Sequence, residues 1–491
     1  MKNNAQNALT NPVFRVLSET AKELGMKAYA VGGFVRDYLL ERDNDDIDVV
    51  VEGSGLDFAK AFDEKVNSSV DLYENFGTAK VHIGPESPLY KSLTNPEIEF
   101  VGCRKEMYER GSRKPIVDDG TLEDDLSRRD FTINAMAISL NEENYGELID
   151  LFDGLKDISN GTIRCVGVPD DRFEEDPLRI YRAVRFKCKL SRPGYEFHYD
   201  GPTFEAMKKN AYRNEILSKE RIVEELNKTM ATPYASSGIR LLSEIGLLKL
   251  ILPEVEAMKC PNDKGHKDIF EHTLQVLDNV ITKSDDLYLR YAALLHDIGK
   301  VPTRKKEAHG WTFHGHPEAG EKMVDKIFRR MKMPNDTRME FVKKMVRLHM
   351  RPTTLAEEGV TDSAIRRILF DAGEDFDSLM ILCESDVTSR YEARRQRVYD
   401  NIQIIKARAK EIEEKDALRN FKNPIDGNYI MDVYQIPPCK EIAVIKDYVK
   451  EAILDGRIGN NFEEAVPVMV EIGEKLGLKL KKDTYGRKTE D

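Results

Sequence analysis

The stretch that decides the fold of the first domain is Val31-Gly32-Gly33-Phe34-Val35-Arg36-Asp37, followed after a short loop by Asp46-Ile47-Asp48-Val49-Val50-Val51. Paired glycines let a backbone approach phosphates closely, and their N–H groups can cradle them. Arg36, a turn further on, can offer a fixed positive fork to a triphosphate. Residues two apart in a strand point to the same face, so Asp46 and Asp48 direct both carboxylates at one spot. Mg²⁺ favours such carboxylates together with phosphate oxygens, and two ions there can activate a hydroxyl and stabilise a leaving pyrophosphate.

Strand and helix signals divide the chain into an α/β part and a helical part. Short β-rich segments alternate with helical ones over the first 160 residues, and strand signals nearly vanish after Asp176. The stretch Asn262-Asp263-Lys264-Gly265 has the composition of a linker, and a second, softer boundary falls near 410 to 420. These patterns predict an α+β protein with a small mixed-sheet head, an all-helical neck, a helical third domain and a helical tail, at residues 1–160, 161–260, 261–410 and 411–491.

Composition narrows the class of protein and its compartment. Of the 491 residues, 41% are hydrophobic and 33% are charged, as in ordinary globular proteins. We expect no membrane association, because no apolar run approaches the ~18 residues of a span and the N-terminus lacks a secretory signal's apolar segment. Six separated cysteines without a CxxC pair favour a reducing cytoplasm. The net charge of −12 argues against nonspecific polyanion binding, although the run from Pro177 to Tyr195 is strongly basic.

The Gly-Gly turn and the paired aspartates, in this order, resemble the polymerase-beta-type nucleotidyltransferase superfamily. Its bacterial CCA-adding and poly(A) polymerase branch carries GGxVRD followed by DxD, as in Gly32–Asp37 and Asp46–Asp48. The resemblance implies that Gly32, Gly33 and Arg36 bind the nucleotide and that Asp46 and Asp48 are catalytic and hold Mg²⁺. Family members often need a third acid on a neighbouring strand. Glu99 is the candidate, and an exposed strand glutamate without a catalytic role is the alternative.

Further motifs follow in the order that this resemblance predicts. The run from Asp125 to Ala137 resembles the RRDFTINA block, which implies that Arg128, Arg129 and Asp130 contact the ribose and phosphates of the incoming nucleotide. A loop rich in Arg and Lys between Cys103 and Pro115 resembles the flexible loop of enzymes that add the terminal A. The segment Asp150–Gly154 resembles the hinge between head and neck.

The neck contains the residues that we expect to choose the base. Asp176 before Pro177 is a good helix start, and Arg179, Arg182 and Arg185 then recur every three residues along one drifting face. For Arg185 in particular, contact with RNA phosphates is an equally good interpretation. All three arginines are predicted to bind nucleotide.

Asp176 and Arg179 together can mimic a base-pairing partner. Cytosine and adenine both offer an exocyclic amino donor beside a ring-nitrogen acceptor. An aspartate accepts from the amine and an arginine donates to the ring nitrogen, each bond contributing roughly 1.5–3 kcal/mol. Guanine and uracil present a carbonyl where the aspartate needs a donor. The pair matches the family's EDxxR motif at Glu175–Arg179, and Ser218–Ile222 with Glu225 resembles the helix that buttresses the neck.

The second half carries an ordered series of histidines and aspartates that resembles the HD phosphohydrolase superfamily. Imidazole and carboxylate ligands suit Mn, Ni, Co, Fe or Zn, with open positions for water and phosphate. His314 is an alternative to one of the ligands, His316, and an inactive, structural HD domain is the alternative to the hydrolase. In this superfamily's pattern the metal ligands are His272, His296, Asp297, His316, His349 and Asp386.

These resemblances imply a template-independent, cytoplasmic enzyme that adds C, C and A to tRNA 3′ ends from CTP and ATP with Mg²⁺. They also imply a phosphohydrolase that uses a divalent transition metal. The C-terminal tail is expected to contact tRNA, and the alternative is that its helices only pack against one another. The alternatives are a bacterial poly(A) polymerase, an enzyme that adds only A or only CC, and an HD hydrolase whose head binds RNA without catalysis. The oligomeric state stays open.

Overall fold

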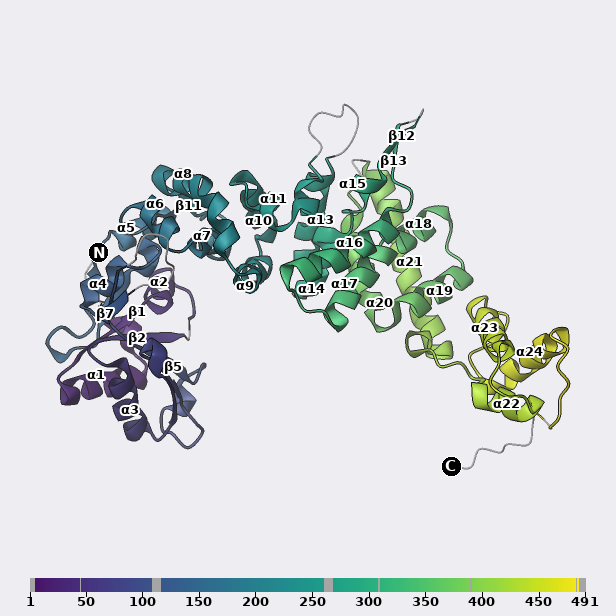
Figure 1. Cartoon of the computed structure of the whole chain (residues 1–491), viewed down its shortest axis with the longest axis horizontal. Coiled ribbons are helices and arrows are strands. Elements are labelled where there is room, and N and C mark those ends of the chain that lie inside the picture. Colours follow the sequence, from purple (N-terminus) through teal and green to yellow (C-terminus); the bar gives the residue numbers. More distant parts are fainter. Residues whose placement is uncertain are drawn as a thin grey trace. The chain divides into compact units, whose positions relative to one another are not determined.

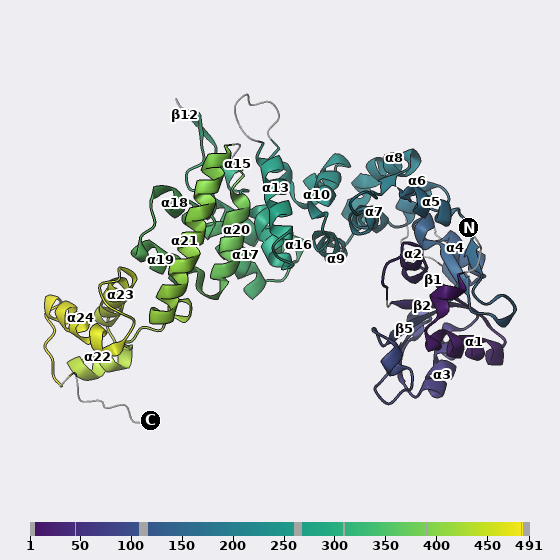
Figure 2. The same cartoon turned by 180° about the vertical axis from the view of Figure 1, so that it is seen from behind.

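The structure is a computed structural model that describes residues 5–44, 46–107, 116–259, 268–307, 310–388, 391–482 and 484. Two features expected from the sequence lie outside these residues, namely the linker at 262–265 and most of the basic loop between Cys103 and Pro115. The chain divides into two compact units, residues 1–247 and 248–491 (Figure 1 and Figure 2). The finer division into four parts stays a prediction.

A mixed seven-stranded sheet forms the centre of the first unit, with strand order β3-β4-β5-β2-β1-β8-β9. Strand β2 (Ile47–Glu52) pairs parallel with β5 (Glu97–Gly102) and antiparallel with β1 (Lys27–Val31). The expected small mixed sheet is therefore confirmed. The other four strands pair antiparallel with their neighbours and are β3 (Ser69–Tyr73), β4 (Thr78–His82), β8 (Met136–Ser139) and β9 (Leu148–Asp150).

Strand β2 is central because its side chains are apolar on both faces. Val49, Val50 and Val51 are all buried, which is the pattern of a strand covered on each side. Helices α1 (Pro12–Leu24) and α3 (Gly55–Val66) pack on one another and on the sheet (Figure 1). The start of β2, where the paired aspartates lie, is thereby held on a rigid element.

The neck part of the first unit is a set of packed helices. Helix α7 (Leu178–Leu190) contacts both α9 (Lys219–Met230) and α10 (Ala235–Glu244). A two-residue parallel ladder between β10 (Thr162–Ile163) and β11 (His198–Tyr199) is an addition to the expected all-helical neck. Two-residue strands are too short to leave a strand signal in the sequence. This unit also contains helices α4 (Leu122–Ser127), α5 (Gly154–Asn160), α6 (Pro169–Glu175) and α8 (Gly201–Asn210).

The second unit is helical and centres on α14 (Leu287–Leu295), which is buried from Leu289 to its end. A short hairpin of β12 (Lys305–Glu307) and β13 (Gly310–Thr312) interrupts the helices. No helix among the described residues is both long and apolar enough to cross a membrane. Helices α13 (Ile269–Ile281), α17 (Thr337–Leu348) and α20 (Phe376–Asp386) pack on α14, and α16 (His316–Met331) packs on α17.

The C-terminal part of this unit is helical, as expected. Helix α21 (Glu392–Asp416) runs without interruption through residue 410 and ends where Ala417 adopts a positive φ of 46°. The end of the helix therefore lies inside the predicted 410 to 420 window. Three helices follow it, α22 (Gly427–Tyr434), α23 (Lys440–Leu454) and α24 (Phe462–Lys475).

Candidate active sites

The Gly-Gly turn joins β1 to helix α2 (Gly33–Leu39). Its first position favours glycine for two reasons, the backbone conformation and the small space available to a side chain. Gly32 has a φ of 69°, in the left-handed region that side chains disfavour. A Cβ on Gly32 would lie 3.1 Å from Arg129 Nη1 and 3.6 Å from Asp48 Oδ2. The turn thus brings bare backbone against a guanidinium and a carboxylate, which leaves the space that a phosphate would need.

A cavity of about 720 Å³ in the first unit gathers side chains from the turn, from β2, from the segment after α4 and from α7. Basic side chains outnumber carboxylates in its lining, so it suits a polyanionic ligand. Every residue predicted to bind nucleotide, and both predicted magnesium ligands, line this cavity: Gly32, Gly33, Arg36, Asp46, Asp48, Arg128, Arg129, Asp130, Asp176, Arg179, Arg182 and Arg185.

A second cavity of about 250 Å³ shares Asp46 and Asp48 with the first and contains Glu99. Asp48 and Glu99 are register partners on the parallel strands β2 and β5. Asp46 is exposed and accepts a hydrogen bond of 2.9 Å from Asn95 Nδ2. Burial raises the pKa of Asp48 to about 6, and the negative charge of Glu99 adds to the rise. Concentrated carboxylate charge of this kind fits a divalent cation with oxygen ligands.

Lys80 is a cation beside these carboxylates that the sequence motifs did not identify. It lies on β4 as the register partner of Glu99, and its Nζ is 3.1 Å from Glu99 Oε1 and 3.0 Å from Glu97 Oε2. Cross-strand neighbours of this kind depend on sheet register, which a motif search does not reveal. Lys80 therefore holds the candidate third carboxylate in place beside Asp48.

Asp125 orients both arginines of the Arg128-Arg129 pair. Its side chain is fully buried, and its two oxygens accept from Arg128 Nε at 3.0 Å and from Arg129 Nη2 at 2.9 Å. Such charge-assisted forks fix the planes of the guanidinium groups. The sequence carries a signal for this contact, because Asp125 lies three residues before Arg128 and four before Arg129, the spacing at which side chains meet on a helix.

Asp130, which directly follows the Arg128-Arg129 pair in the sequence, belongs to a second ion-pair network that joins head and neck. Asp130 is buried and accepts from Arg182 Nε at 2.7 Å. Although burial opposes ionisation, Arg182 and a hydrogen bond from Asn134 hold the pKa of Asp130 at about 2. Arg36 is only 3% exposed and donates to Asp37 at 2.7 Å and to Asn134 at 2.8 Å. Most of the Arg36 donors are therefore used inside the protein, and its role as a triphosphate fork stays a prediction.

The predicted base-reading pair is held by hydrogen bonds at the start of α7. Asp176 accepts from the backbone N–H of Leu178 at 3.1 Å through Oδ1 and from Arg221 Nη2 at 3.0 Å through Oδ2. Arg179 donates to Glu175 Oε2 at 2.7 Å and to the Arg128 carbonyl at 2.9 Å. Arg179 also donates to the Arg172 carbonyl at 3.1 Å.

Arg185 forms a buried ion pair and also lines the cavity. Its Nε donates to Glu225 Oε2 at 2.6 Å, and the Glu225 side chain is 5% exposed. Its guanidinium lies 4.5 Å from the ring centroid of Phe186, which packs edge-on against Phe131 of the head. Arg185 therefore helps to hold the neck helices together at the cavity wall.

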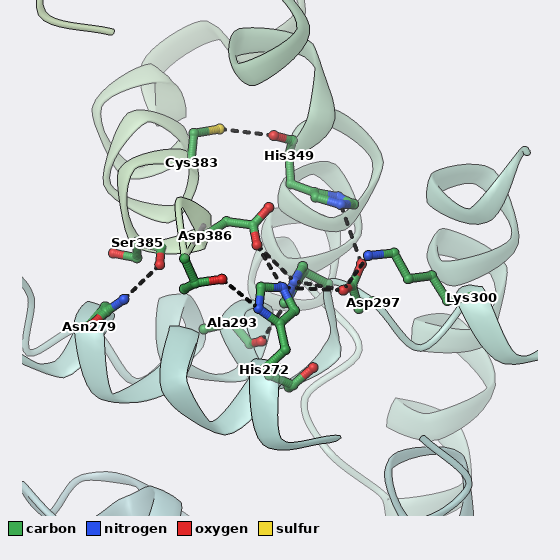
Figure 3. A network of polar contacts seen from close by, with 12 residues as sticks. His272, Asn279, Ala293, Asp297, Lys300, His349, Cys383, Ser385 and Asp386 are labelled. Carbon is green, nitrogen blue, oxygen red and sulfur yellow. Dashed lines mark hydrogen bonds and ion pairs between the residues drawn. The ribbon is translucent and has the colours of Figure 1, made fainter. Parts of the chain in front are cut away.

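In the second unit the six predicted metal ligands converge from helices α13, α16 and α20, from the segment after α14 and from the residue directly after α17. Figure 3 labels four of them, His272, Asp297, His349 and Asp386. We call these six residues the HD centre. His316, the first residue of α16, belongs to it, whereas the alternative His314 is exposed. The ligand atoms form two groups, each within 4.8 Å, which are His272, His296 and Asp386, and Asp297, His316 and His349.

Asp297 lies between the two pairs of histidines. Its Oδ2 is 3.5 Å from His272 Nε2 and 3.3 Å from His296 Nε2. Its Oδ1 is 3.7 Å from His316 Nε2 and 3.8 Å from His349 Nε2. One carboxylate thus faces both groups, an arrangement that can bridge two metal ions.

Backbone carbonyls determine which nitrogen of three histidines faces the centre. Each accepts from an Nδ1–H, which leaves Nε2 as the unprotonated nitrogen in the neutral ring and directs it inward. The contacts are His296 with Ala293 at 2.8 Å, His316 with Phe313 at 3.0 Å and His349 with Val346 at 2.7 Å.

Two buried polar atoms of the HD centre indicate that it binds a metal ion. Within the described part of the chain, His296 Nε2 and Asp297 Oδ1 are buried without a hydrogen-bond partner, which is costly unless a cation is bound. Burial would lower the pKa of His296, yet Asp297 and Asp386 raise it to about 10, so the centre favours positive charge. Burial lowers the pKa of His349 to about 4, which keeps that ring neutral and able to bind a metal. The donor set fits a transition metal.

Lys300 is a further charged residue at the HD centre. Its Nζ lies 2.7 Å from Asp297 Oδ2, one helical turn after the aspartate (Figure 3). Lys300 lies three residues after Asp297 in the sequence, and this helical spacing was the signal that the two side chains could meet.

Family models match three parts of this chain. The poly A polymerase head domain matches residues 28–164, the probable RNA and SrmB-binding site of polymerase A matches residues 196–259, and the HD domain matches residues 269–391. The matches follow the order of the motifs along the chain.

Curated relatives of this chain carry two kinds of name. An A-adding tRNA nucleotidyltransferase of Geobacter sulfurreducens is 37% identical over 286 residues, which are 57% of this chain but only 29% of that protein. Multifunctional CCA proteins of Vibrio parahaemolyticus and Pseudoalteromonas atlantica are 32% and 31% identical over 382 and 389 residues. Those alignments cover 74% and 77% of this chain and 86% and 90% of the relatives.

Solved structures share the fold over nearly the whole chain. A CCA-adding enzyme in apo form II has a TM-score of 0.64 at 22% identity, covering 95% of this chain and 98% of that one. A Thermotoga maritima CCA-adding enzyme complexed with tRNA has a TM-score of 0.60 at 21% identity, covering 96% and 98%. At these identities the likeness shows the fold alone.

Proposed function

Because the chain belongs to the family of CCA-adding tRNA nucleotidyltransferases and poly(A) polymerases with an HD domain, we propose that it adds C, C and A to tRNA 3′ ends from CTP and ATP. The observation that carries the proposal is the cavity of about 720 Å³, whose lining joins the Gly-Gly turn, the paired aspartates and the Asp176–Arg179 pair. A phosphate-binding turn, a metal-binding pair and a base-reading pair within one cavity are the parts that templateless nucleotidyl transfer needs.

The head residues would bind and orient the triphosphate. Mg²⁺ held by Asp46 and Asp48, with Glu99 as third carboxylate, would lower the pKa of the tRNA 3′-hydroxyl and neutralise the leaving pyrophosphate. Gly32 admits the phosphates close to the backbone, and Arg129 faces the same space with its guanidinium held by Asp125.

The neck residues would select the base by its hydrogen-bonding edge. The amino group of cytosine or adenine donates to the Asp176 carboxylate, and an Arg179 N–H donates to the ring nitrogen. Glu175 and the Arg128 carbonyl hold the Arg179 guanidinium in one plane, so the reading geometry is set before the nucleotide binds. Bases with a carbonyl at the amino position would leave a carboxylate and a carbonyl oxygen facing each other.

Primer extension tests this function. Transcripts of a tRNA ending before, within and after CC are incubated with Mg²⁺ and each labelled NTP. Addition that stops after three nucleotides supports the proposal. A long ladder with ATP alone would instead indicate a poly(A) polymerase. Extension restricted to the CC-ended transcript would indicate the A-adding activity that the Geobacter relative's name describes.

We also propose that the HD centre is a phosphohydrolase, since its six ligands and its two buried atoms without partners suit a transition metal such as Mn, Ni, Co, Fe or Zn. The metal would supply a water of lowered pKa as nucleophile. A fitting substrate is a tRNA end with a 2′,3′-cyclic phosphate, which blocks the hydroxyl that the head extends. Such work on tRNA fits a cytoplasmic location.

Hydrolysis of bis-p-nitrophenyl phosphate with Mn²⁺, Ni²⁺ or Co²⁺ tests the second proposal. We expect turnover that disappears in Asp297→Ala, while CCA addition by that variant persists. No turnover with any divalent metal, together with no metal in the purified protein, would leave the HD domain a structural one.

A further inference from the structure

The β12–β13 hairpin lies between two parts of the chain that build the HD centre. Before it comes α15 (Lys300–Thr303), whose Lys300 Nζ contacts Asp297 Oδ2 at 2.7 Å. After it comes Phe313, whose carbonyl is 3.0 Å from Nδ1 of His316. Figure 1 and Figure 2 both show β12 beside α15. The hairpin is therefore anchored to metal-binding residues at both ends.

One face of the hairpin carries alternating cations and aromatic rings. Lys306 and Trp311 are cross-strand partners, so their side chains share a face, with Lys306 Nζ 5.7 Å from the indole centroid. The Arg304 guanidinium lies 3.9 Å from the same centroid. Phe313 follows two residues after Trp311, and Lys300 Nζ lies 5.8 Å from its ring. We call Arg304, Lys306, Trp311 and Phe313 with Lys300 the cation–aromatic face.

The other face of the hairpin differs in chemistry. Lys305 pairs with Thr312, and Thr312 Oγ1 donates to Glu307 Oε1 at 3.1 Å. The described acid of the hairpin therefore lies with Lys305, opposite the indole. The adjacent lysines thus have different surroundings. Lys306 lies beside the indole ring, and Lys305 lies on the face that carries the Glu307 carboxylate.

We propose that the cation–aromatic face binds the single-stranded end of an RNA and leads it to the HD centre. Aromatic rings accept any base by stacking, and cations beside them neutralise the phosphates, which is how single strands are bound without sequence preference. A free phosphate would need the cations alone, whereas the partly exposed rings of Trp311 and Phe313 fit bases. The face ends at Lys300, which contacts Asp297, so a bound strand would present its terminal phosphate there.

The inference rests on the proposed phosphohydrolase, because it names the surface that would hold that enzyme's RNA substrate. The chain as a whole has a net charge of −12, so binding of RNA requires a local basic surface of this kind. A local basic and aromatic strip can recruit a polyanion that the rest of the protein repels.

Tryptophan fluorescence of the full-length protein tests the inference, because Trp311 is the single tryptophan of the chain and reports on this face alone. The probe is a hexamer of C and A nucleotides ending in a 2′,3′-cyclic phosphate. We expect saturable quenching as a base stacks on the indole. Lys306→Ala should raise the Kd by about threefold or more and reduce the salt slope of log K by about 0.7, as for one lost phosphate contact.

Lys305→Ala is the matched control, since it removes the same charge one residue away on the opposite face. It should leave the Kd and the salt slope unchanged. Equal effects of the two substitutions would reduce the effect to bulk charge and overturn the inference, as would the absence of quenching at saturating hexamer. Unchanged emission of each variant without RNA establishes that the hairpin is folded.

Hydrolysis of bis-p-nitrophenyl phosphate by the wild type separates this inference from the hydrolase proposal. Quenching that depends on Lys306 but not on Lys305, without any hydrolysis, would retain the RNA surface and reject the hydrolase. Hydrolysis without quenching would retain the hydrolase and reject the surface.

Discussion

The guanidinium of Arg179 donates a hydrogen bond of 2.9 Å to the backbone carbonyl of Arg128. The residue predicted to read the base is thereby joined directly to the segment predicted to bind ribose and phosphates. Asp130 and Arg182 add a second link of 2.7 Å between the same two segments. The segments predicted to recognise the base and to position the phosphates are therefore mechanically connected, and a change in one is expected to affect the other.

Replacing Asp48 with asparagine should abolish nucleotide addition. The variant keeps the shape of the side chain but loses a charge that Mg²⁺ needs, so we expect a fall in rate of at least about 100-fold. Single-turnover addition to a CC-ended tRNA measures the effect, and filter binding of tRNA should be little changed. Glu99→Gln addresses the third carboxylate in the same assay, and full activity of that variant would remove Glu99 from the catalytic set.

Replacing Asp176 with alanine should relax base selection. Loss of a charged hydrogen bond worth roughly 1.5–3 kcal/mol predicts about a 10- to 100-fold loss of discrimination for CTP over UTP. Competition between CTP and UTP on one primer measures the ratio. Asp171→Ala is the control, because Asp171 is exposed and does not line the cavity. An equal loss of affinity for all four nucleotides would make Asp176 only a cap of α7.

Replacing Asp130 with asparagine should destabilise the first unit in a pH-dependent way. The folded protein lowers the pKa of Asp130 from 3.8 to about 2, so the ionised pair stabilises the fold by about 2 kcal/mol above pH 5. A lowered folded pKa means that this stability is lost as pH falls from about 4 towards 2. Thermal unfolding of wild type and variant at pH 7, 4 and 3 should show a Tm difference that shrinks with acidification. A difference independent of pH would point to lost packing instead.

Replacing His316 with alanine should weaken metal binding at the HD centre, whereas His314→Ala should not. Of these two histidines only His316 belongs to a ligand group, and a lost ligand predicts at least about a 100-fold lower Mn²⁺ affinity. Metal content after dialysis against graded Mn²⁺ measures the difference. Both variants should retain CCA addition, since the head cavity has its own ligands. Equal metal content in the two variants would exclude His316 as a ligand.

Local patterns were enough to predict much of this protein. The Gly-Gly turn, the apolar run of β2 and the Asp176-Pro177 helix start all depend on residues a few positions apart, whose backbone preferences are local. The order of the predicted metal ligands along the chain was also readable, because the series of histidines and aspartates resembles the pattern of the HD superfamily. The mixed sheet and the helical body follow from these local elements.

Only the tertiary structure decided which side chains meet. Lys80 reaches Glu99 through sheet register, and Asp125 takes both guanidinium groups of Arg128 and Arg129 because burial leaves it no water. Spacing alone left His314 and His316 open, and the start of α16 buries the second while the first stays exposed. Contacts between distant residues depend on register and packing, which the whole chain determines, whereas turns and helix starts depend on their own few residues.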